Sequence, residues 1–314
     1  MAEYLFNEPQ YHDAEAAREH LESIRWPKGP VCPHCGAVDR ITKLQGKSHR
    51  PGLYDCGHCR DQFTVTVGTV FERSKISLDK WLFASALMAS SKKGISSKQI
   101  ERMLGVTYKT AWFITHRLRE AMGDAPSGKL GGGGKIVEVD ETYFGSKEGA
   151  KKQRGKVGGA AMKDKCAIVA LVERGGKVRS FHVPSVTNAN LKQVLSTQID
   201  ADTHLMTDEA TRYWKLGKEF TKHSSVNHGR KEYARGEVTT NTVEGFFSIL
   251  KRGLIGTYQH VGERHLHRYV REFDFRYNHR IKLGFDDAQR TTALLKGISG
   301  KRLTYRRIGN GAQA

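Results

Sequence analysis

Two pairs of cysteines near the start of the chain constrain its fold more than any other feature. Cys32 and Cys35 form one C-x2-C knuckle, Cys56 and Cys59 form another, and 20 residues separate the two. Matched knuckles at this spacing are typical of a tetrahedral zinc site, and the metal supplies folding free energy that so short a segment cannot gain from a core. A redox-active pair is the alternative, but it would not need a second matched knuckle. We therefore predict one structural zinc ion held by four thiolates in a zinc ribbon over residues 26–75.

The same cysteines, and the lack of an apolar membrane-spanning stretch, indicate the cellular compartment. A metal site of free thiolates suits a reducing cytoplasm, and Cys166 lies in an apolar run where it is most simply a core residue. The sequence has no apolar stretch of about 18 residues that could span a bilayer. Its first residues lack the basic and apolar parts of a secretory signal. We expect a cytoplasmic protein with no membrane partner.

The charge of the chain favours a polyanionic partner. It contains 52 Lys and Arg against 33 Asp and Glu, a formal net charge of +19. Such an excess favours nucleic acid through counterion release at the phosphate backbone, although a basic protein without that function is the simpler alternative. At 314 residues the chain is long enough for two or three folded units.

Residues 76–122 have the pattern of a helix-turn-helix region. Residues 77–91 show helical apolar spacing, and a short amphipathic helix at 96–104, a turn at Gly105 and a longer helix at 107–122 follow. In that arrangement the second helix enters the major groove of DNA, whereas two helices of an ordinary bundle are the alternative. The residues predicted to contact DNA from this helix are Tyr108, Lys109, Thr110, Arg117 and Arg119.

A glycine-rich segment divides the chain. Residues 123–134 include four consecutive glycines and predict a flexible linker. Before it we place an N-terminal helical segment (1–25), the ribbon (26–75) and the helix-turn-helix (76–122). After it we place a catalytic domain (135–282) and a basic C-terminal tail (283–314).

The larger domain has a recognisable order of elements. A strand ends at Asp140, two strands at 166–173 and 177–183 are joined by a hairpin signal, a helix spans 190–199, and a strand at 204–207 ends at Asp208. Strand, hairpin, helix and strand, with an acid on the first and fourth strands, is the order of ribonuclease H-like folds.

A third acid completes a set of candidate metal ligands. Glu244 lies in a helix-like stretch, with 35 residues between it and Asp208. Carboxylates at strand ends and on a neighbouring helix can converge at a sheet edge, where oxygen ligands suit magnesium or manganese. Two such ions catalyse in-line phosphoryl transfer. For any one acid, a surface carboxylate is the simpler reading, but three in this order in a basic chain favour phosphodiester chemistry.

The sequence around these acids resembles bacterial insertion-sequence transposases of the DDE superfamily, in the group with an N-terminal zinc ribbon. The resemblance rests on Val-Asp140-Glu-Thr-Tyr-Phe-Gly, Thr-Asp208-Glu, and Thr-Asn241-Thr-Val-Glu244-Gly-Phe-Phe-Ser-Ile-Leu-Lys251-Arg-Gly. It extends from Trp26 to about Arg280. Glu244 and Lys251 are seven residues apart, two helical turns, and share one helix face.

The resemblance implies a fold, a site and a function. The fold is α/β: a ribonuclease H-like catalytic domain with a mixed five-stranded sheet, preceded by the ribbon and the helix-turn-helix. Asp140, Asp208 and Glu244 would hold two Mg2+ (or Mn2+) ions, and Lys251 would lie near the scissile phosphate. Asn241 is an alternative third ligand, but an anionic oxygen binds a hard ion better than an amide.

The implied activity is that of a transposase associated with the nucleoid. It would bind the terminal inverted repeats of its element, cleave the ends and join the 3′-hydroxyls to target DNA, acting as a homodimer or larger assembly on double-stranded DNA. Two alternatives remain: a DNA-binding regulator derived from such a protein, and a metal-dependent nuclease that does not join strands. Sequence does not separate cleavage from joining, because both use the same acids.

Further basic residues flank the predicted site. The loop at 146–165 follows the first acid and could hold a DNA strand, or it could be a solvated loop. The additional residues predicted to contact DNA are Lys151, Lys152, Arg154, Lys156 and Arg252.

Overall fold

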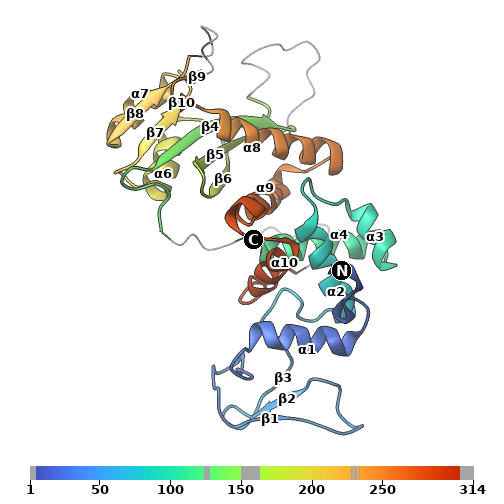
Figure 1. The fold of residues 1–314 in the computed structure, drawn as a ribbon. Helices are drawn as coiled ribbons and strands as arrows, with labels where there is room; N and C mark the ends of the chain where they lie inside the picture. Colours follow the sequence, from blue (N-terminus) through green and yellow to red (C-terminus); the bar gives the residue numbers. More distant parts are fainter. Residues whose placement is uncertain are drawn as a thin grey trace. The chain divides into compact units, whose positions relative to one another are not determined.

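The computed structural model describes residues 5–123, 128–149, 163–227, 229, 232 and 234–304. It divides into two compact units (Figure 1), the first comprising Met1–Gly123 with Phe285–Ala314 and the second Asp124–Gly284. Among the described residues, no helix combines the length and apolar character needed to cross a membrane.

Unit 1 contains a small sheet and several helices. Its elements are the short 3-10 helices η1 (Leu5–Asn7) and η2 (Pro9–Tyr11), helix α1 (Ala14–Arg25), strands β1 (Ile41–Lys43), β2 (Tyr54–Cys56) and β3 (Gln62–Phe63), and helices α2 (Leu78–Ser90), α3 (Ser97–Leu104), α4 (Tyr108–Ala121) and α10 (Asp287–Lys296). The three strands form an antiparallel sheet in the order β1-β2-β3. Its core is aromatic, because the rings of Trp26, Tyr54 and Phe63 pack on one another with centroids 5.4–5.8 Å apart.

The helix-turn-helix pattern is present as two capped helices. The Ser96 side chain accepts a hydrogen bond from the amide of Gln99 at the start of α3, and Thr107 caps α4 in the same way through Thr110. Between them Gly105 adopts a left-handed conformation (φ 60°), which glycine adopts without steric cost.

The end of the chain differs from the sequence prediction. We predicted a basic tail over 283–314, whereas helix α10 occupies Asp287–Lys296 and packs on α2 within unit 1. Leu294 and Leu295 are buried there, and Asp286 forms a capping box with Gln289 at the start of the helix. The net basicity of the segment obscured its amphipathic character.

Unit 2 is built on a mixed five-stranded sheet. Its strands are β4 (Ile136–Phe144), β5 (Cys166–Glu173), β6 (Val178–Val183), β7 (His204–Thr207) and β8 (Lys222–Ser225), and the order is β6-β5-β4-β7-β8. Strands β6, β5 and β4 pair antiparallel, whereas β4, β7 and β8 pair parallel. This confirms the ribonuclease H-like topology predicted from the order of elements.

Helices cover both faces of this sheet (Figure 1). The remaining elements are α6 (Asn188–Gln198), α7 (Arg212–Leu216), η3 (Gly217–Glu219), the short strands β9 (Ala234–Arg235) and β10 (Val238–Thr239), α8 (Asn241–Arg252), the π-helical turn η5 (Gly253–Thr257), α9 (Glu263–Asn278) and η6 (Ile281–Leu283). One hydrophobic core joins the sheet to α6 and α7, and another joins it to α8 and α9. Because side chains alternate along a strand, each β4 residue faces one of these two cores.

The described part of the glycine-rich segment is packed and not a free linker. Leu130 is 3% exposed, and its backbone bonds to Gln198 and Asp200. Gly131 has φ 82°, and a Cβ there would lie 2.0 Å from the Thr203 hydroxyl, so this close approach requires glycine. The prediction of a flexible linker is therefore wrong for residues 128–134, where backbone hydrogen bonds hold the segment on unit 2.

Candidate active site

Strand register brings Asp140 and Asp208 to one place on the sheet. Strands β4 and β7 are parallel, with Ile136 opposite His204 and Glu138 opposite Met206. Continuing this register by two residues sets Asp140 beside Asp208, which directly follows β7. Odd-numbered β4 residues such as Val137 lie in the core with α6, so Asp140 belongs to the face covered by α8.

A buried glutamate attaches α8 to the same face. Glu138 is 0% exposed, and its Oε2 accepts hydrogen bonds from the amides of Thr242 (2.8 Å) and Val243 (3.0 Å) in the first turn of α8. Its Oε1 accepts from the Thr242 hydroxyl and from Arg174 Nε at 2.6 Å. The carboxylate thus satisfies amides that a helix N-terminus leaves unpaired and complements the helix dipole. Glu244, in the same turn, is thereby placed relative to β4.

The acids of the candidate site influence one another through their charges. Burial, and then the negative charges of Glu141, Asp208 and Glu244, raise the pKa of Asp140 to about 7 from 3.8. The Asp140 side chain accepts a hydrogen bond from the Glu141 amide, and Asp208 accepts one from the Ala210 amide. Strand β4, the residue after β7 and helix α8 therefore each contribute a carboxylate, and these carboxylates repel one another.

Glu141 faces the other side of β4. Its carboxylate accepts a hydrogen bond from the Tyr213 hydroxyl at 2.5 Å and forms an ion pair with Arg212 at 2.9 Å. Burial raises the pKa of Glu141, while Tyr213 and Arg212 oppose that rise. These contacts tie α7 to β4 directly behind Asp140.

The donor set suits a hard divalent cation. Asp140, Asp208 and Glu244 offer carboxylate oxygens, the ligands that Mg2+ and Mn2+ prefer, and a cation would offset the burial and the mutual repulsion that raise the pKa of Asp140. The Glu244 side chain is exposed, and its Oε1 accepts a hydrogen bond from Thr240 at 2.8 Å. Asn241 is also exposed on the first turn of α8.

Two basic residues predicted to act at this site lie at the other end of α8. Lys251 and Arg252 are exposed in the last turn, and Arg252 donates to the Ser248 hydroxyl at 2.6 Å. Lys251 lies two turns beyond Glu244 on the same helix.

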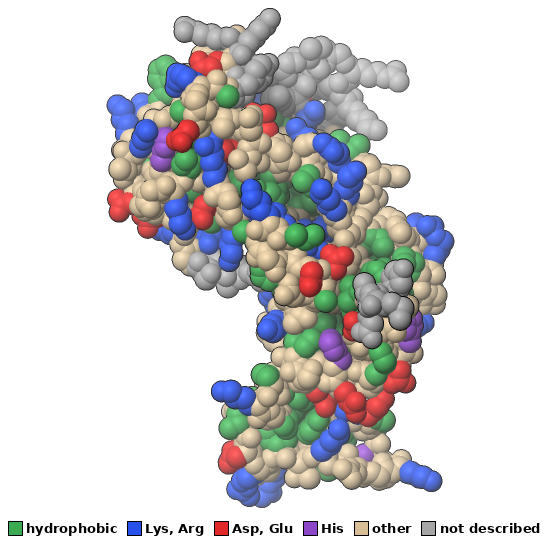
Figure 2. Space-filling view, in the orientation of Figure 1, with side chains coloured by type: hydrophobic (Ala, Val, Ile, Leu, Met, Phe, Trp, Pro, Cys, Tyr) green, Lys and Arg blue, Asp and Glu red, His purple; other side chains and the backbone are tan. Residues whose placement is uncertain are grey.

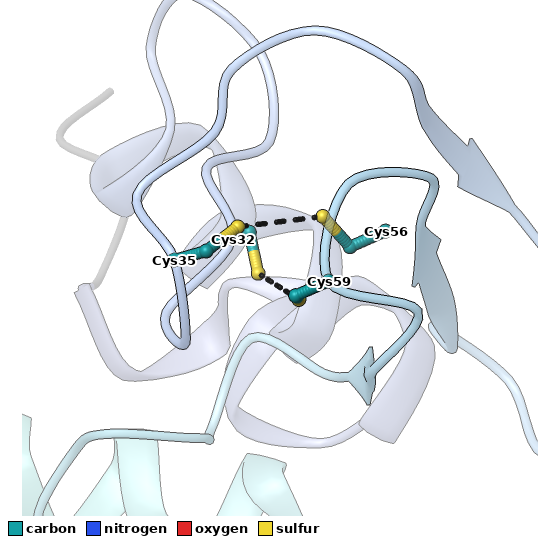
Figure 3. A group of neighbouring side chains, drawn as sticks. All are labelled: Cys32, Cys35, Cys56 and Cys59. Atoms are coloured by element: carbon teal, nitrogen blue, oxygen red, sulfur yellow. Dashed lines mark hydrogen bonds between the residues drawn. The ribbon is translucent and has the colours of Figure 1, made fainter.

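The four cysteines of the ribbon meet as predicted (Figure 3). All are free thiols, with Cys32 and Cys59 sulfurs 3.7 Å apart and Cys35 and Cys56 sulfurs 3.6 Å apart. Zinc bound tetrahedrally at about 2.3 Å from each thiolate requires sulfurs about 3.8 Å apart. The cluster therefore fits one structural zinc ion.

The predicted DNA-contacting residues of α4 divide into two groups. Tyr108 is 46% exposed, Lys109 is exposed, and Thr110 is half-buried. Arg117, in contrast, is 8% exposed and Arg119 is fully buried.

The prediction that Arg117 and Arg119 contact DNA is wrong in this fold. Arg117 donates hydrogen bonds to the carbonyl groups of Val70 and Glu72, and to that of Leu303. Its guanidinium holds segments of unit 1 together, because the apolar face of α4 turns this end of the helix inward. Of the other predicted contacts, Lys151, Lys152, Arg154 and Lys156 lie outside the described residues.

Comparison with known proteins assigns the chain to a family. A model of the ISXO2-like transposase domain matches residues 129–278, and one of the transposase zinc-ribbon domain matches residues 12–62. A protein described as an uncharacterized protein in transposable element ISH50 of Halobacterium salinarum (strain ATCC 700922 / JCM 11081 / NRC-1) is 30% identical over 270 residues, covering 82% of this chain and 88% of the relative. The chain belongs to the IS1595 family of DDE transposases. The relative is archaeal, so it gives no support for the narrower description as bacterial.

The likeness to solved structures is weaker than the family match. A chain in the cryo-EM structure of the simian T-cell lymphotropic virus intasome in complex with PP2A regulatory subunit B56 gamma has 14% identity and a TM-score of 0.29. The match covers 56% of this IS1595-family chain and 63% of that chain. The fold assignment therefore rests on the strand order and the family models.

Sequence reasoning missed Glu138 in this IS1595-family site. The alternation of Val137, Glu138, Val139 and Asp140 contains the relevant signal, because it puts an acid on the same face of the strand as Asp140. What the sequence does not contain is the partner of that acid. Glu138 meets the N-terminus of α8, which lies more than a hundred residues further along the chain.

Proposed function

We propose that this chain is a DNA transposase that binds the terminal inverted repeats of its element, cleaves the ends and joins the 3′-hydroxyls to target DNA. The observation that carries the proposal is the placement of Asp140, Asp208 and Glu244 on one side of the sheet, within reach of one another's charge. Family membership supports catalytic transposase activity on DNA. The individual steps are our inference.

The catalytic roles that we propose are supported by the contacts of the residues. Asp140, Asp208 and Glu244 would hold two magnesium ions, which when bound activate the attacking oxygen and stabilise the departing one. Glu138 holds α8, and with it Glu244, against β4. Glu141, bonded to Tyr213 and Arg212, holds the opposite side of β4. These contacts keep the carboxylates in place before DNA binds, which reduces the reorganisation that catalysis requires.

DNA contacts would come from both units. In unit 1, Tyr108, Lys109 and Thr110 begin a helix of helix-turn-helix type and include exposed side chains, as a helix entering the major groove requires. In unit 2, Lys251 and Arg252 extend the α8 face beyond Glu244, where a phosphate backbone would be attracted. Figure 2 shows Lys and Arg side chains, in blue, spread over the visible face of unit 2. A pair of transposon ends implies a dimer or a larger assembly on DNA.

The test is a strand-transfer assay with matched variants. Purified protein is incubated with DNA bearing the repeats that flank its gene, a supercoiled target and magnesium. Asp208→Asn removes a proposed ligand, whereas Glu209→Gln makes the same kind of change at the adjacent residue. We expect cleaved ends and joined products with the wild type and with Glu209→Gln, and neither product with Asp208→Asn.

The other outcomes identify the alternative functions. Specific binding of the repeats without cleavage by the wild type would favour a DNA-binding regulator. Metal-dependent cleavage without joined products would favour a nuclease. Full activity of Asp208→Asn would refute the assignment of the metal ligands.

A further inference from the structure

A second group of metal-ligand side chains meets in unit 2, away from the three carboxylates. Cys166, His182 and Glu263 each offer one ligand atom, and these atoms lie within 4.8 Å of one another. Asp140 pairs with Ala170, four residues along β5 from Cys166, which corresponds to about 13 Å of strand. The two groups are therefore separate sites.

Three different elements build this cluster. Cys166 begins β5 and His182 lies near the end of β6, and because His182 pairs with Ile168 both side chains are on the sheet face covered by α9. Glu263 is the first residue of α9. The helix is fixed on β6 by Asp274, which accepts two hydrogen bonds from Ser180. The fold thus places the start of α9 over the ends of both strands.

The ligand atoms of the cluster lie close together, but His182 and Glu263 do not form a hydrogen bond with each other. Within the described part of the chain, buried His182 Nε2 has no hydrogen-bond partner, and it lies 3.8 Å from Glu263 Oε1, beyond hydrogen-bonding distance. Two ligands bound tetrahedrally to zinc at about 2.0–2.1 Å lie about 3.4 Å apart, so only a small movement is needed. Cys166 is 2% exposed. An unpaired buried imidazole nitrogen is costly, and a metal would satisfy it.

Residues of the loop that follows β4 contact the cluster and its neighbours. The amide of Glu148 donates to Glu263 Oε2 at 2.6 Å, while the Glu148 side chain forms an ion pair with Arg264. The ammonium of Lys147 donates to the carbonyl of Pro184 at 2.8 Å. Glu263 Oε1 is left facing His182.

We propose that Cys166, His182 and Glu263 form a second zinc site, with three protein ligands and a fourth position for water or an external ligand. Sulfur, nitrogen and oxygen donors together suit a borderline-soft ion such as Zn2+ and do not suit Mg2+, which prefers oxygen alone. One thiolate and one carboxylate balance the charge of the ion. Binding would fasten the N-terminus of α9 to β5 and β6, and so support the helical layer that covers the sheet. The proposal does not depend on the proposed function.

The test is a cobalt titration of the full-length protein after its ribbon has been loaded with zinc. Bound cobalt reports thiolate coordination through a charge-transfer absorption band, which an all-oxygen site does not give. We expect a band that saturates at one added equivalent and disappears on addition of competing zinc. Glu263→Gln and His182→Gln should each weaken cobalt binding at least about tenfold, since even changes around metal ligands cost that much.

Two further variants make the result decisive. Cys166→Ser should abolish the band, and Glu219→Gln, which changes an exposed acid paired with Lys192 outside the cluster, should leave it unchanged. Circular dichroism and thermal melting of the proteins with zinc-loaded ribbons, before cobalt is added, would establish that each variant is folded. Glu263→Gln changes the first residue of α9 and keeps the test open if Cys166→Ser does not fold. Absence of the band in the folded wild type, or equal bands in the wild type, Cys166→Ser and Glu263→Gln, would overturn the proposal.

Discussion

The contact between Glu138 and the start of α8 makes a sharp prediction. Every partner of this carboxylate among the residues that the structure describes is a donor: two backbone amides and the Thr242 hydroxyl on α8, and the guanidinium of Arg174. In Glu138→Gln the new NH2 group must face donors whichever way the amide is turned. The variant therefore loses hydrogen bonds and brings donors together in a site that is 0% exposed.

The magnitude follows from these contacts. Removing one partner of a buried charged pair costs about 3–5 kcal/mol. We expect the lower end, about 3 kcal/mol, because Arg174 is 23% exposed and keeps its hydrogen bonds to the carbonyl groups of Glu237 and Thr239. If α8 opens locally, this corresponds to roughly 100-fold faster amide hydrogen exchange in the helix.

Hydrogen exchange measured by mass spectrometry on peptides from α8 gives the comparison directly. The control is Glu219→Gln, because the ion pair of Glu219 with Lys192 has the same 2.6 Å separation but lies at the surface, with the glutamate 42% exposed. A surface pair is worth at most about 1 kcal/mol, so the control should change exchange little. Unchanged exchange of α8 in Glu138→Gln, or equal effects of the two variants, would refute the reasoning.

Three further predictions concern other parts of the molecule. Cys59→Ser should lose zinc and make the ribbon (26–75) sensitive to protease, since the metal supplies the folding free energy of the ribbon. Protease resistance equal to that of the wild type, at low zinc content, would contradict this. Burial raises the pKa of Asp274 from 3.8 to about 7, so the folded state holds this proton more tightly than the unfolded chain, and stability should fall as pH rises through that range. Relative to Asp274→Asn, the wild type should lose up to about 4 kcal/mol between about pH 4 and pH 8 in urea unfolding, and a difference independent of pH would refute the cause. Finally, Lys109→Ala should weaken binding to repeat DNA without changing the melting temperature. Arg117→Met should instead lower the melting temperature, because it removes buried hydrogen bonds. Weaker DNA binding by Arg117→Met at an unchanged melting temperature, with a lower melting temperature for Lys109→Ala, would restore Arg117 as a DNA contact.

Several features could be predicted from the sequence because they depend on local pattern. The knuckles Cys32 to Cys35 and Cys56 to Cys59 lie close in the chain, and their chemistry leaves few alternatives to a zinc site. The strands of unit 2 were predicted from runs of apolar residues, and their order sufficed to predict the sheet topology. That β4 and β7 bring Asp140 and Asp208 side by side follows from that topology, although β4 does not end at Asp140 as predicted but continues to Phe144.

Other features needed contacts between distant parts of the chain. Arg117 and Arg119 look like DNA contacts on an isolated basic helix, and only the packing of α4 shows that they are buried. The segment containing Leu130 looks like a linker until its hydrogen bonds to unit 2 are seen. Helix α10 reads as part of a basic tail because its partner, α2, lies about two hundred residues earlier.

The sequence by itself determined the chemical kind of each candidate site: thiolates suited to zinc in the ribbon and carboxylates suited to a divalent ion on the ribonuclease H-like sheet. Ligand type is a property of single side chains, so it can be read from a list of residues. Only the tertiary structure decided how the site is held, through Glu138 at the start of α8, and only it brought Cys166, His182 and Glu263 together. These contacts depend on strand register and on where a helix packs, and both are settled by the burial of whole faces and not by any short stretch of sequence.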